Sequence, residues 1–213
     1  MSRRQKTVCK HGTVAIVAND SARYTVFAAS LRSLEVPQGT VFRWAFGFDY
    51  VRNRNQLVET MEGDWIWFID DDHAFGPDIL RRLLAHNLPI TVPACLARAK
   101  PFLPVVWKDG ERVDYQAYPQ GGMLEVDAAG TAGMLIRRQM FDGLDEPYFQ
   151  HGDRSEDIIF SERVREAGIP IHCDLDSRIG HATTSVIWPV RKDDGWNVGF
   201  SIADAYTIET RPW

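Results

Sequence analysis

The feature that most constrains this 213-residue chain is an apolar run that ends in three consecutive carboxylates. Residues 65–69 are Trp-Ile-Trp-Phe-Ile, and Asp70, Asp71 and Asp72 follow directly. Such an unbroken apolar run predicts a strand with both faces buried, as in the parallel sheets of α/β proteins. The carboxylates are then expected at the carboxyl edge of the sheet, where open α/β sheets bind their ligands.

The acidic triplet requires a compensating charge, because adjacent carboxylates repel one another. A hard divalent cation with oxygen ligands would supply that charge. Since side chains alternate along a strand, we expect Asp70 and Asp72 to face one way and Asp71 the other. The alternative is a solvated acidic turn before a helix that Pro77 opens. The buried run in front of the triplet favours the metal site.

The segments around this strand alternate between strand and helix patterns. Apolar periodicity and turn residues predict strands at residues 13–18, 41–46 and 89–93, and helices at residues 22–34, from Asp49 to Met61, and at 78–86. With residues 65–69 as the third strand, the order is β-α-β-α-β-α-β. This order predicts a mostly parallel, layered α/β sheet.

The pattern changes after residue 95. Prolines and the Gly121-Gly122 pair predict a hairpin or loop excursion over residues 95–124. We expect short strands at 105–107, 113–118, 124–126, 134–137 and 169–173, and a helix at 156–167 that Ser155 caps. The final residues carry few periodic signals, so we expect a lid or a docking tail there.

Composition excludes several classes of protein. The chain is 45% hydrophobic and 25% charged, as globular domains are, and its apolar runs are too short for a membrane span. No apolar signal-peptide segment is visible, so we expect a cytoplasmic location. The cysteines are 3 in number and form no CxxC pair, so neither a disulfide framework nor a zinc knuckle is predicted. The net charge of −5 disfavours non-specific binding to nucleic acid.

Several motifs, in one order, resemble the family 2 glycosyltransferases, which are metal-dependent enzymes of the GT-A fold that use nucleotide sugars. Arg54-Asn55 is similar to the Ala-Arg-Asn segment of that family, and residues 70–72 are similar to its DxD motif. Residues 130–138, beginning Gly-Thr-Ala-Gly, resemble the Gly-rich strand under the donor sugar. Asn19-Asp20 stands where the family more often has a Pro-containing turn.

Two later motifs extend the resemblance. Ser155-Glu156-Asp157 resembles the start of the helix that carries the catalytic Glu-Asp pair, and Gly180-His181 resembles the histidine that completes the metal site. The resemblance implies a Rossmann-like α/β/α sandwich with a mostly parallel central sheet. Residues 13–185 would form the catalytic domain, residues 1–12 a flexible segment, and residues 186–213 the tail or lid packed on that domain.

The resemblance also implies roles for individual residues. Mn²⁺ or Mg²⁺ would be held by Asp72 and His181, with Asp70 as a further ligand or a ribose contact. Asp157 would be the general base of an inverting transfer, and the dipole of its helix would favour its charged form. The resemblance implies a UDP-sugar as the donor, and its remaining contacts would come from Asn19, Asp20, Arg54, Asp71 and Gly133. His73, His151 and His172 receive no role.

Other functions stay open. A nucleotidyltransferase on a related fold is disfavoured because residues 18–21 lack the Gly-rich loop that cradles a triphosphate. A phosphatase with an aspartyl nucleophile would carry its acidic pair after the first strand, not the third. A non-catalytic module that binds a sugar or a nucleotide is the remaining class. The acceptor stays open between a protein side chain, a saccharide and a modified nucleic-acid base, as does the oligomeric state.

Overall fold

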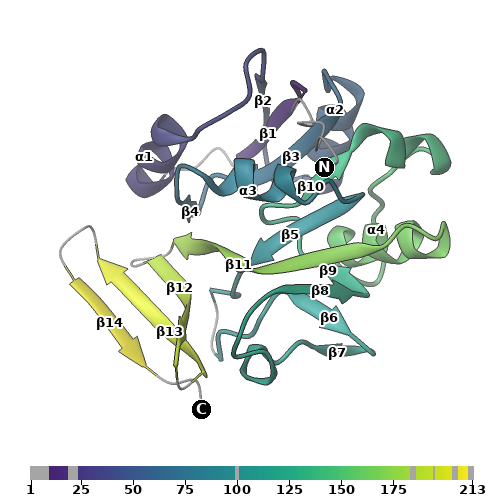
Figure 1. Cartoon of the computed structure of the whole chain (residues 1–213). Helices are drawn as coiled ribbons and strands as arrows, with labels where there is room; N and C mark the ends of the chain where they lie inside the picture. The colour runs from purple at the N-terminus through teal and green to yellow at the C-terminus, as the bar shows by residue number, and fades with distance from the viewer. Residues whose placement is uncertain are drawn as a thin grey trace, which may run out of the picture.

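The computed structural model describes residues 10–18, 24–98, 101–182, 186–193, 195–202 and 206–210. Asn19 and Asp20, the expected contacts to the nucleotide base, lie outside the described residues, as do residues 1–9 of the expected N-terminal segment. Within the described part, one large sheet runs through the molecule in the order β14-β13-β12-β11-β5-β10-β3-β1-β2 (Figure 1).

The half of this sheet from β11 to β2 contains strands that run in one direction. These strands are β1 (Thr13–Ala18), β2 (Val41–Phe46), β3 (Trp65–Asp70), β5 (Ile90–Ala94) and β11 (Ile171–Ala182). β1 pairs in parallel with β2 and β3, and β5 pairs in parallel with β11. β10 (Leu135–Arg137) lies between β3 and β5 and runs antiparallel to both. The predicted α/β class with its parallel core is confirmed.

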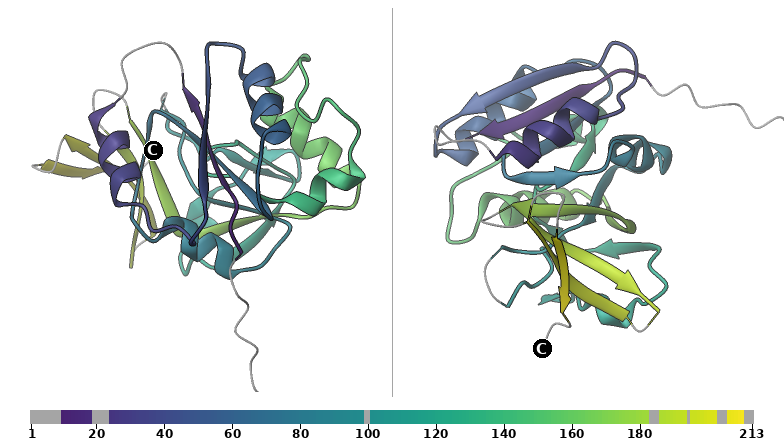
Figure 2. Two further views of the ribbon diagram at one scale, coloured as in Figure 1. Left: turned by 90° about the horizontal axis from the view of Figure 1, so that it is seen from above. Right: turned by 90° about the vertical axis from the view of Figure 1, so that its left-hand side faces the viewer.

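Helices cover both faces of this half of the sheet. They are α1 (Thr25–Ser33), α2 (Tyr50–Glu59), α3 (Ile79–Ala85) and α4 (Glu156–Glu166). Leu57 of α2 and Phe160 of α4 share one core cluster with Phe68 of β3. Phe27 of α1 and Leu80 of α3 pack in a second core cluster on the opposite face of β3, which contains the β3 residues Trp65, Trp67 and Ile69. The apolar run thus buries both faces of β3, and Figure 2 shows the resulting α/β/α sandwich.

The segment between β5 and α4 departs from the prediction in one place. It contains β6 (Val106–Lys108), β7 (Glu111–Arg112), β8 (Met123–Val126) and β9 (Ala128–Ala129), with 3₁₀ turns at Tyr115–Ala117 and Arg138–Gly143. The strand predicted at residues 113–118 is wrong, because the Asp114 side chain accepts a hydrogen bond from the Gln116 amide and closes a turn.

The C-terminal part forms more regular structure than its sequence pattern indicates. β12 (Val186–Lys192), β13 (Gly195–Ile202) and β14 (Tyr206–Thr210) continue antiparallel from the end of β11 (Figure 1). Val26 of α1 packs against a small core cluster that contains Val186 of β12. A lid function for residues 186–213 stays a prediction. Among the helices of the described residues, none has the length and apolar character needed to cross a membrane.

Candidate active site at the carboxyl edge of the sheet

The acidic triplet is held in place by its backbone. The Asp71 amide donates to the Val17 carbonyl of β1 at 3.1 Å, and the Ala182 amide of β11 donates to the Asp72 carbonyl at 2.6 Å. The residues after the triplet form β4 (His73–Phe75), which pairs antiparallel with β11 and sets His73 opposite His181. Two strands far apart in the chain therefore fix the triplet between them.

The first group of charged side chains contains the predicted metal ligands. Asp70, Asp72 and His73 each offer a ligand atom, and these atoms lie within 4.8 Å of one another. His181 Nε2 lies 3.5 Å from Asp72 Oδ2. Asp71, whose side chain was expected to face the other way, is 7% exposed. The structure thus brings Asp70, Asp72 and His181 together and adds His73 to them.

A hydrogen bond orients the His181 ring. Its Nδ1 lies 3.0 Å from the Leu96 carbonyl oxygen, which can only accept, so Nδ1 carries a hydrogen. Nε2 is then the nitrogen that faces Asp72. Histidine ligands in metal sites are commonly oriented in this way, by a bond from the ring nitrogen that does not touch the metal.

Cations surround Asp72 and keep it ionised. Burial raises the pKa of Asp72, but a hydrogen bond from His181 and the charges of His73, His181 and Arg98 outweigh it and hold that pKa well below its usual range. Arg98 Nη1 lies 2.6 Å from Asp72 Oδ2. Burial lowers the pKa of His181, but the contacts of His181 with Asp72 and Cys95 outweigh burial and raise that pKa to about 10. A metal ion bound here would replace the Nε2 proton.

The second group of charged side chains surrounds Arg54. The Asp49 side chain accepts from the Arg52 amide at 3.0 Å and starts α2, which carries Arg54 inward. Arg54 is 3% exposed, its Nε lies 3.1 Å from Glu156 Oε1, and its Nη2 lies 3.4 Å from Asp70 Oδ1. One buried guanidinium therefore links the end of β3 to the start of α4.

Asp157 lies beside this link, in the first turn of α4. Its Oδ1 accepts from the Ile158 amide at 2.8 Å and from the Ser155 hydroxyl. Burial and the charge of Glu156 raise the pKa of Asp157, and they outweigh the two hydrogen bonds and the charge of Arg54, which lower it. A Cβ atom on Gly130 would lie 3.4 Å from Asp157 Oδ2, so the Gly-rich segment and this carboxylate are neighbours.

Two residues of the predicted motifs have structural roles. The Asn55 side chain donates to the Phe149 carbonyl at 2.8 Å and accepts from the Phe149 amide at 3.0 Å, which ties α2 to the segment before α4. Gly133 has a φ of +72°, and a Cβ atom there would lie 2.7 Å from Pro93 Cγ. Its backbone therefore packs against β5, and a donor contact by Gly133 stays a prediction.

Three residues near Asp72 were not predicted from the sequence. They are His73, Cys95 and Arg98, which reach Asp72 and His181 from β4 and from the segment after β5. The adjacency of His73 to the triplet was the one available signal. Burial raises the pKa of the Cys95 thiol, but the neighbouring His181 and His73 side chains and their charges outweigh burial and bring that pKa to about 7.

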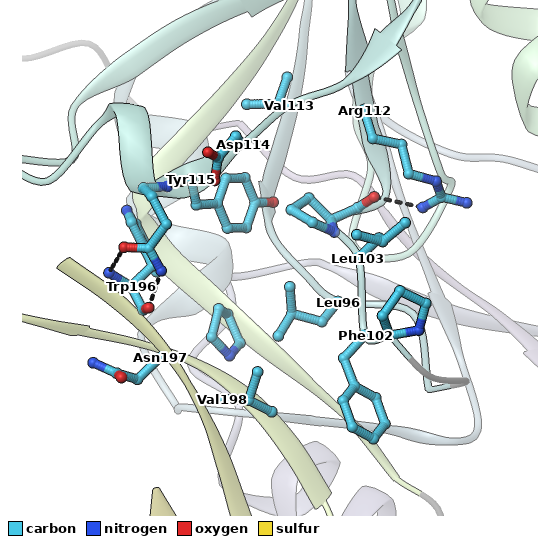
Figure 3. Close-up of a pocket in the computed structure, with 14 residues that line it drawn as sticks. Leu96, Phe102, Leu103, Arg112, Val113, Asp114, Tyr115, Trp196, Asn197 and Val198 are labelled. Atoms are coloured by element: carbon cyan, nitrogen blue, oxygen red, sulfur yellow. Dashed lines mark hydrogen bonds between the residues drawn. The ribbon is translucent and has the colours of Figure 1, made fainter. Parts of the chain in front are cut away.

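A cavity of about 410 Å³ lies near this edge but contains none of the predicted donor or metal residues. Figure 3 shows its mostly apolar lining, where Leu96 and Phe102 face Tyr115 and Val198. Trp196, also in the lining, is 3% exposed and donates from Nε1 to the Tyr118 carbonyl at 3.1 Å. This aromatic residue of the tail therefore belongs to the core.

The geometry agrees with the comparison by sequence. The sequence profile of glycosyl transferase family 2 matches residues 10–142. The chain belongs to this family. The matched part includes Arg54 and the triplet at residues 70–72, and the chain is thus a glycosyltransferase of the GT-A fold. No curated protein matches the chain by sequence.

Solved structures of other proteins share the fold of this family 2 chain. A197 from STIV superposes with a TM-score of 0.65 at 12% identity, over 92% of this chain and 97% of A197. GalNAc-T7, solved with UDP, GalNAc and Mn²⁺, superposes with a TM-score of 0.57 at 13% identity, over 80% of this chain and 44% of GalNAc-T7. At such identities these likenesses establish the fold alone.

Proposed function

We propose that the chain transfers a sugar from a nucleoside diphosphate sugar, specifically a UDP-sugar, to an acceptor hydroxyl with inversion of configuration. The observation that carries this proposal is the pair of charged groups at one sheet edge. One of them gathers Asp70, Asp72 and His181, and the other presents Asp157 beside the Gly-rich segment. Membership of family 2 supports the donor class, and GalNAc-T7, with its UDP and Mn²⁺, is a structural neighbour.

The first group of charged side chains has the kinds of ligand atom that Mn²⁺ or Mg²⁺ binds. Asp72 and His181 would hold the ion, with Asp70 as a further ligand or a contact to the ribose. Carboxylate oxygens with an imidazole fit Mn²⁺, and the depressed pKa of Asp72 keeps its oxygens free of protons. The bound ion would neutralise the departing diphosphate. Arg98, which is 52% exposed in its side chain, can swing away from Asp72 to admit the ion.

The second group provides the proton acceptor. The acceptor hydroxyl gives its proton to Asp157 as its oxygen attacks the anomeric carbon, and the bond to the diphosphate breaks on the opposite face of the sugar. Because the raised pKa of Asp157 increases its proton affinity, it is a stronger base than an exposed aspartate. Arg54 holds Glu156 and Asp70 and so positions the start of α4 against β3.

Calorimetric titration of the protein with UDP tests this proposal. We expect UDP to bind in the presence of Mn²⁺, to bind much more weakly without it, and to bind better than GDP. The Asp64→Asn variant is a matched control, because Asp64 is a half-buried carboxylate just before β3 that pairs with Lys10 at 3.1 Å. Equal affinity with and without Mn²⁺ would contradict the metal assignment, and binding of neither nucleotide would contradict the donor assignment.

A further inference from the structure

A second set of ligand atoms lies next to the DxD carboxylates. His73, Cys95 and His181 each offer one such atom, and these atoms lie within 4.8 Å of one another. The ring centroids of the two histidines are 4.6 Å apart. His73 belongs to β4, Cys95 directly follows β5, and His181 belongs to β11. The pairing of β4 with β11 sets the two histidines opposite each other. The set is therefore built into the sheet.

His73 is the group that this arrangement leaves unexplained. It is 0% exposed, and its Nδ1 lies 3.2 Å from the Asp70 carbonyl oxygen. Among the residues that the structure describes, none forms a hydrogen bond with His73 Nε2, although that atom is buried. A buried ring nitrogen without a partner costs free energy. When Nδ1 donates to Asp70, Nε2 carries a lone pair, which a metal ion can accept.

We propose that His73, Cys95 and His181 form a site for a zinc-class divalent ion, separate in ligand chemistry from the oxygen-rich DxD site. Thiolate and imidazole donors select zinc over magnesium or manganese. Three protein ligands leave a fourth tetrahedral position, which the nearby Asp72 carboxylate or a water molecule fills. Binding releases the thiol proton of Cys95 and any protons on the two ring nitrogens that bind the ion.

The site shares His181 with the proposed Mn²⁺ site, and this has a regulatory consequence. Because His181 Nδ1 bonds to the Leu96 carbonyl, Nε2 is the nitrogen left for a metal, and it can serve one ion at a time. Zinc at the proposed site and Mn²⁺ held through His181 therefore exclude each other. This consequence rests on the proposed function, whereas the zinc-class site itself does not.

Titration of the intact chain with Co²⁺, a spectroscopic substitute for zinc, tests the site. We expect a thiolate-to-cobalt charge-transfer band in the near ultraviolet and the intense visible bands of tetrahedral cobalt, both saturating at one equivalent and both lost on addition of Zn²⁺. Cys95→Ser should lose the charge-transfer band. Cys173→Ser is the matched control, because Cys173 is also buried and free, and Cys9→Ser controls for the third cysteine. Both controls should keep the band.

X-ray absorption of the zinc-loaded wild-type chain keeps the test decisive if Cys95→Ser fails to fold. One sulfur ligand at about 2.3 Å is expected. A first shell of nitrogen and oxygen alone, or a cobalt band that survives in a folded Cys95→Ser variant, would overturn the proposal.

The competition with Mn²⁺ separates this proposal from the proposed function. We expect Zn²⁺ to abolish Mn²⁺-dependent UDP binding in the wild type and to do so less effectively in His73→Ala. If UDP fails to bind with Mn²⁺ while the cobalt band is present, the donor assignment fails and the zinc-class site stands. If UDP binds with Mn²⁺ and no cobalt band forms, the zinc-class site is wrong.

Discussion

Asp72 and Asp157 lie at the same edge of the sheet, yet their environments shift their pKa values in opposite directions. Both are partly buried, which by itself raises the pKa of a carboxyl group. Around Asp72, contacts with Arg98, His73 and His181 outweigh burial. Around Asp157, burial and the charge of Glu156 outweigh the hydrogen bonds from Ser155 and Ile158 and the charge of Arg54. Neighbouring charges thus give the two carboxylates the opposite pKa shifts that suit their proposed roles as a cation ligand and a base.

The largest expected effect comes from removing the charge of Asp72. In Asp72→Asn, the amide cannot replace the carboxylate as an anionic ligand, and the cations around it lose their counter-charge. We expect Mn²⁺-dependent UDP binding to be abolished in calorimetric titration, with Asp64→Asn binding as the wild type does. Unchanged affinity of Asp72→Asn in Mn²⁺ would place the metal elsewhere.

The next effect should separate binding from catalysis. Asp157→Asn removes the proton acceptor but leaves the first group of charged residues intact. We expect the turnover number to fall by about 10²–10⁴-fold, the usual contribution of a general base, while donor affinity changes only a few fold. Steady-state transfer assays and UDP titration on the same preparation measure both. A fully active variant would remove Asp157 from the mechanism.

Arg54, which links the two groups of charged side chains, is expected to stabilise the fold. Arg54→Ala leaves Asp70 and Glu156 without their buried partner, and breaking a buried pair in this way costs about 3–5 kcal/mol. Arg52→Ala, at an exposed position of the same helix, should change the free energy of unfolding by about 0.5 kcal/mol or less. Urea unfolding measures both, and equal stabilities would show that Arg54 does not hold the two groups together.

The pH dependence of transfer should follow Asp157. A base acts when it is deprotonated, so kcat/KM should rise with pH through the pKa of Asp157, which burial raises above its ordinary value. The hydrogen bond from Ser155 lowers that pKa, so Ser155→Ala should move the acid limb to higher pH. If the acid limb of the pH profile stays at the same pH in Ser155→Ala, that limb belongs to a titrating group other than Asp157.

The smallest effect concerns Arg98, which contacts the Asp72 Oδ2 atom that the proposed metal ion would bind. Its side chain is 52% exposed, so the ion pair is worth about 0.2–1 kcal/mol. Arg98→Ala should therefore tighten Mn²⁺ binding by about fivefold or less. Weaker Mn²⁺ binding in this variant would instead make Arg98 a contact to the donor diphosphate.

Much of the central fold was predictable because its signals are local. The alternation of strand and helix patterns up to residue 94 gave the strands at 13–18 and 41–46 with the bounds that the structure has. The C-terminal strands were missed because β12, β13 and β14 are stabilised by pairing with one another and with β11, and their sequences carry few periodic signals of their own.

The candidate site was predictable where a motif carried it. Arg54, Asp70, Asp72, Asp157 and His181 each belong to such a motif, and the structure places them in two adjacent groups. Gly133 and Asn55 also lie in motifs, but the structure gives them packing and hydrogen-bonding roles. A motif therefore predicted which residues gather at the edge more reliably than what each of them does.

The sequence by itself determined the buried strand that ends in carboxylates, because an apolar run followed by charged residues leaves few other solutions. Only the tertiary structure decided which side chains gather around those carboxylates. The pairing of β4 with β11 brings His73 to His181, and the segment after β5 adds Cys95 and Arg98. Contacts between residues about 100 positions apart depend on sheet register, which no local pattern encodes.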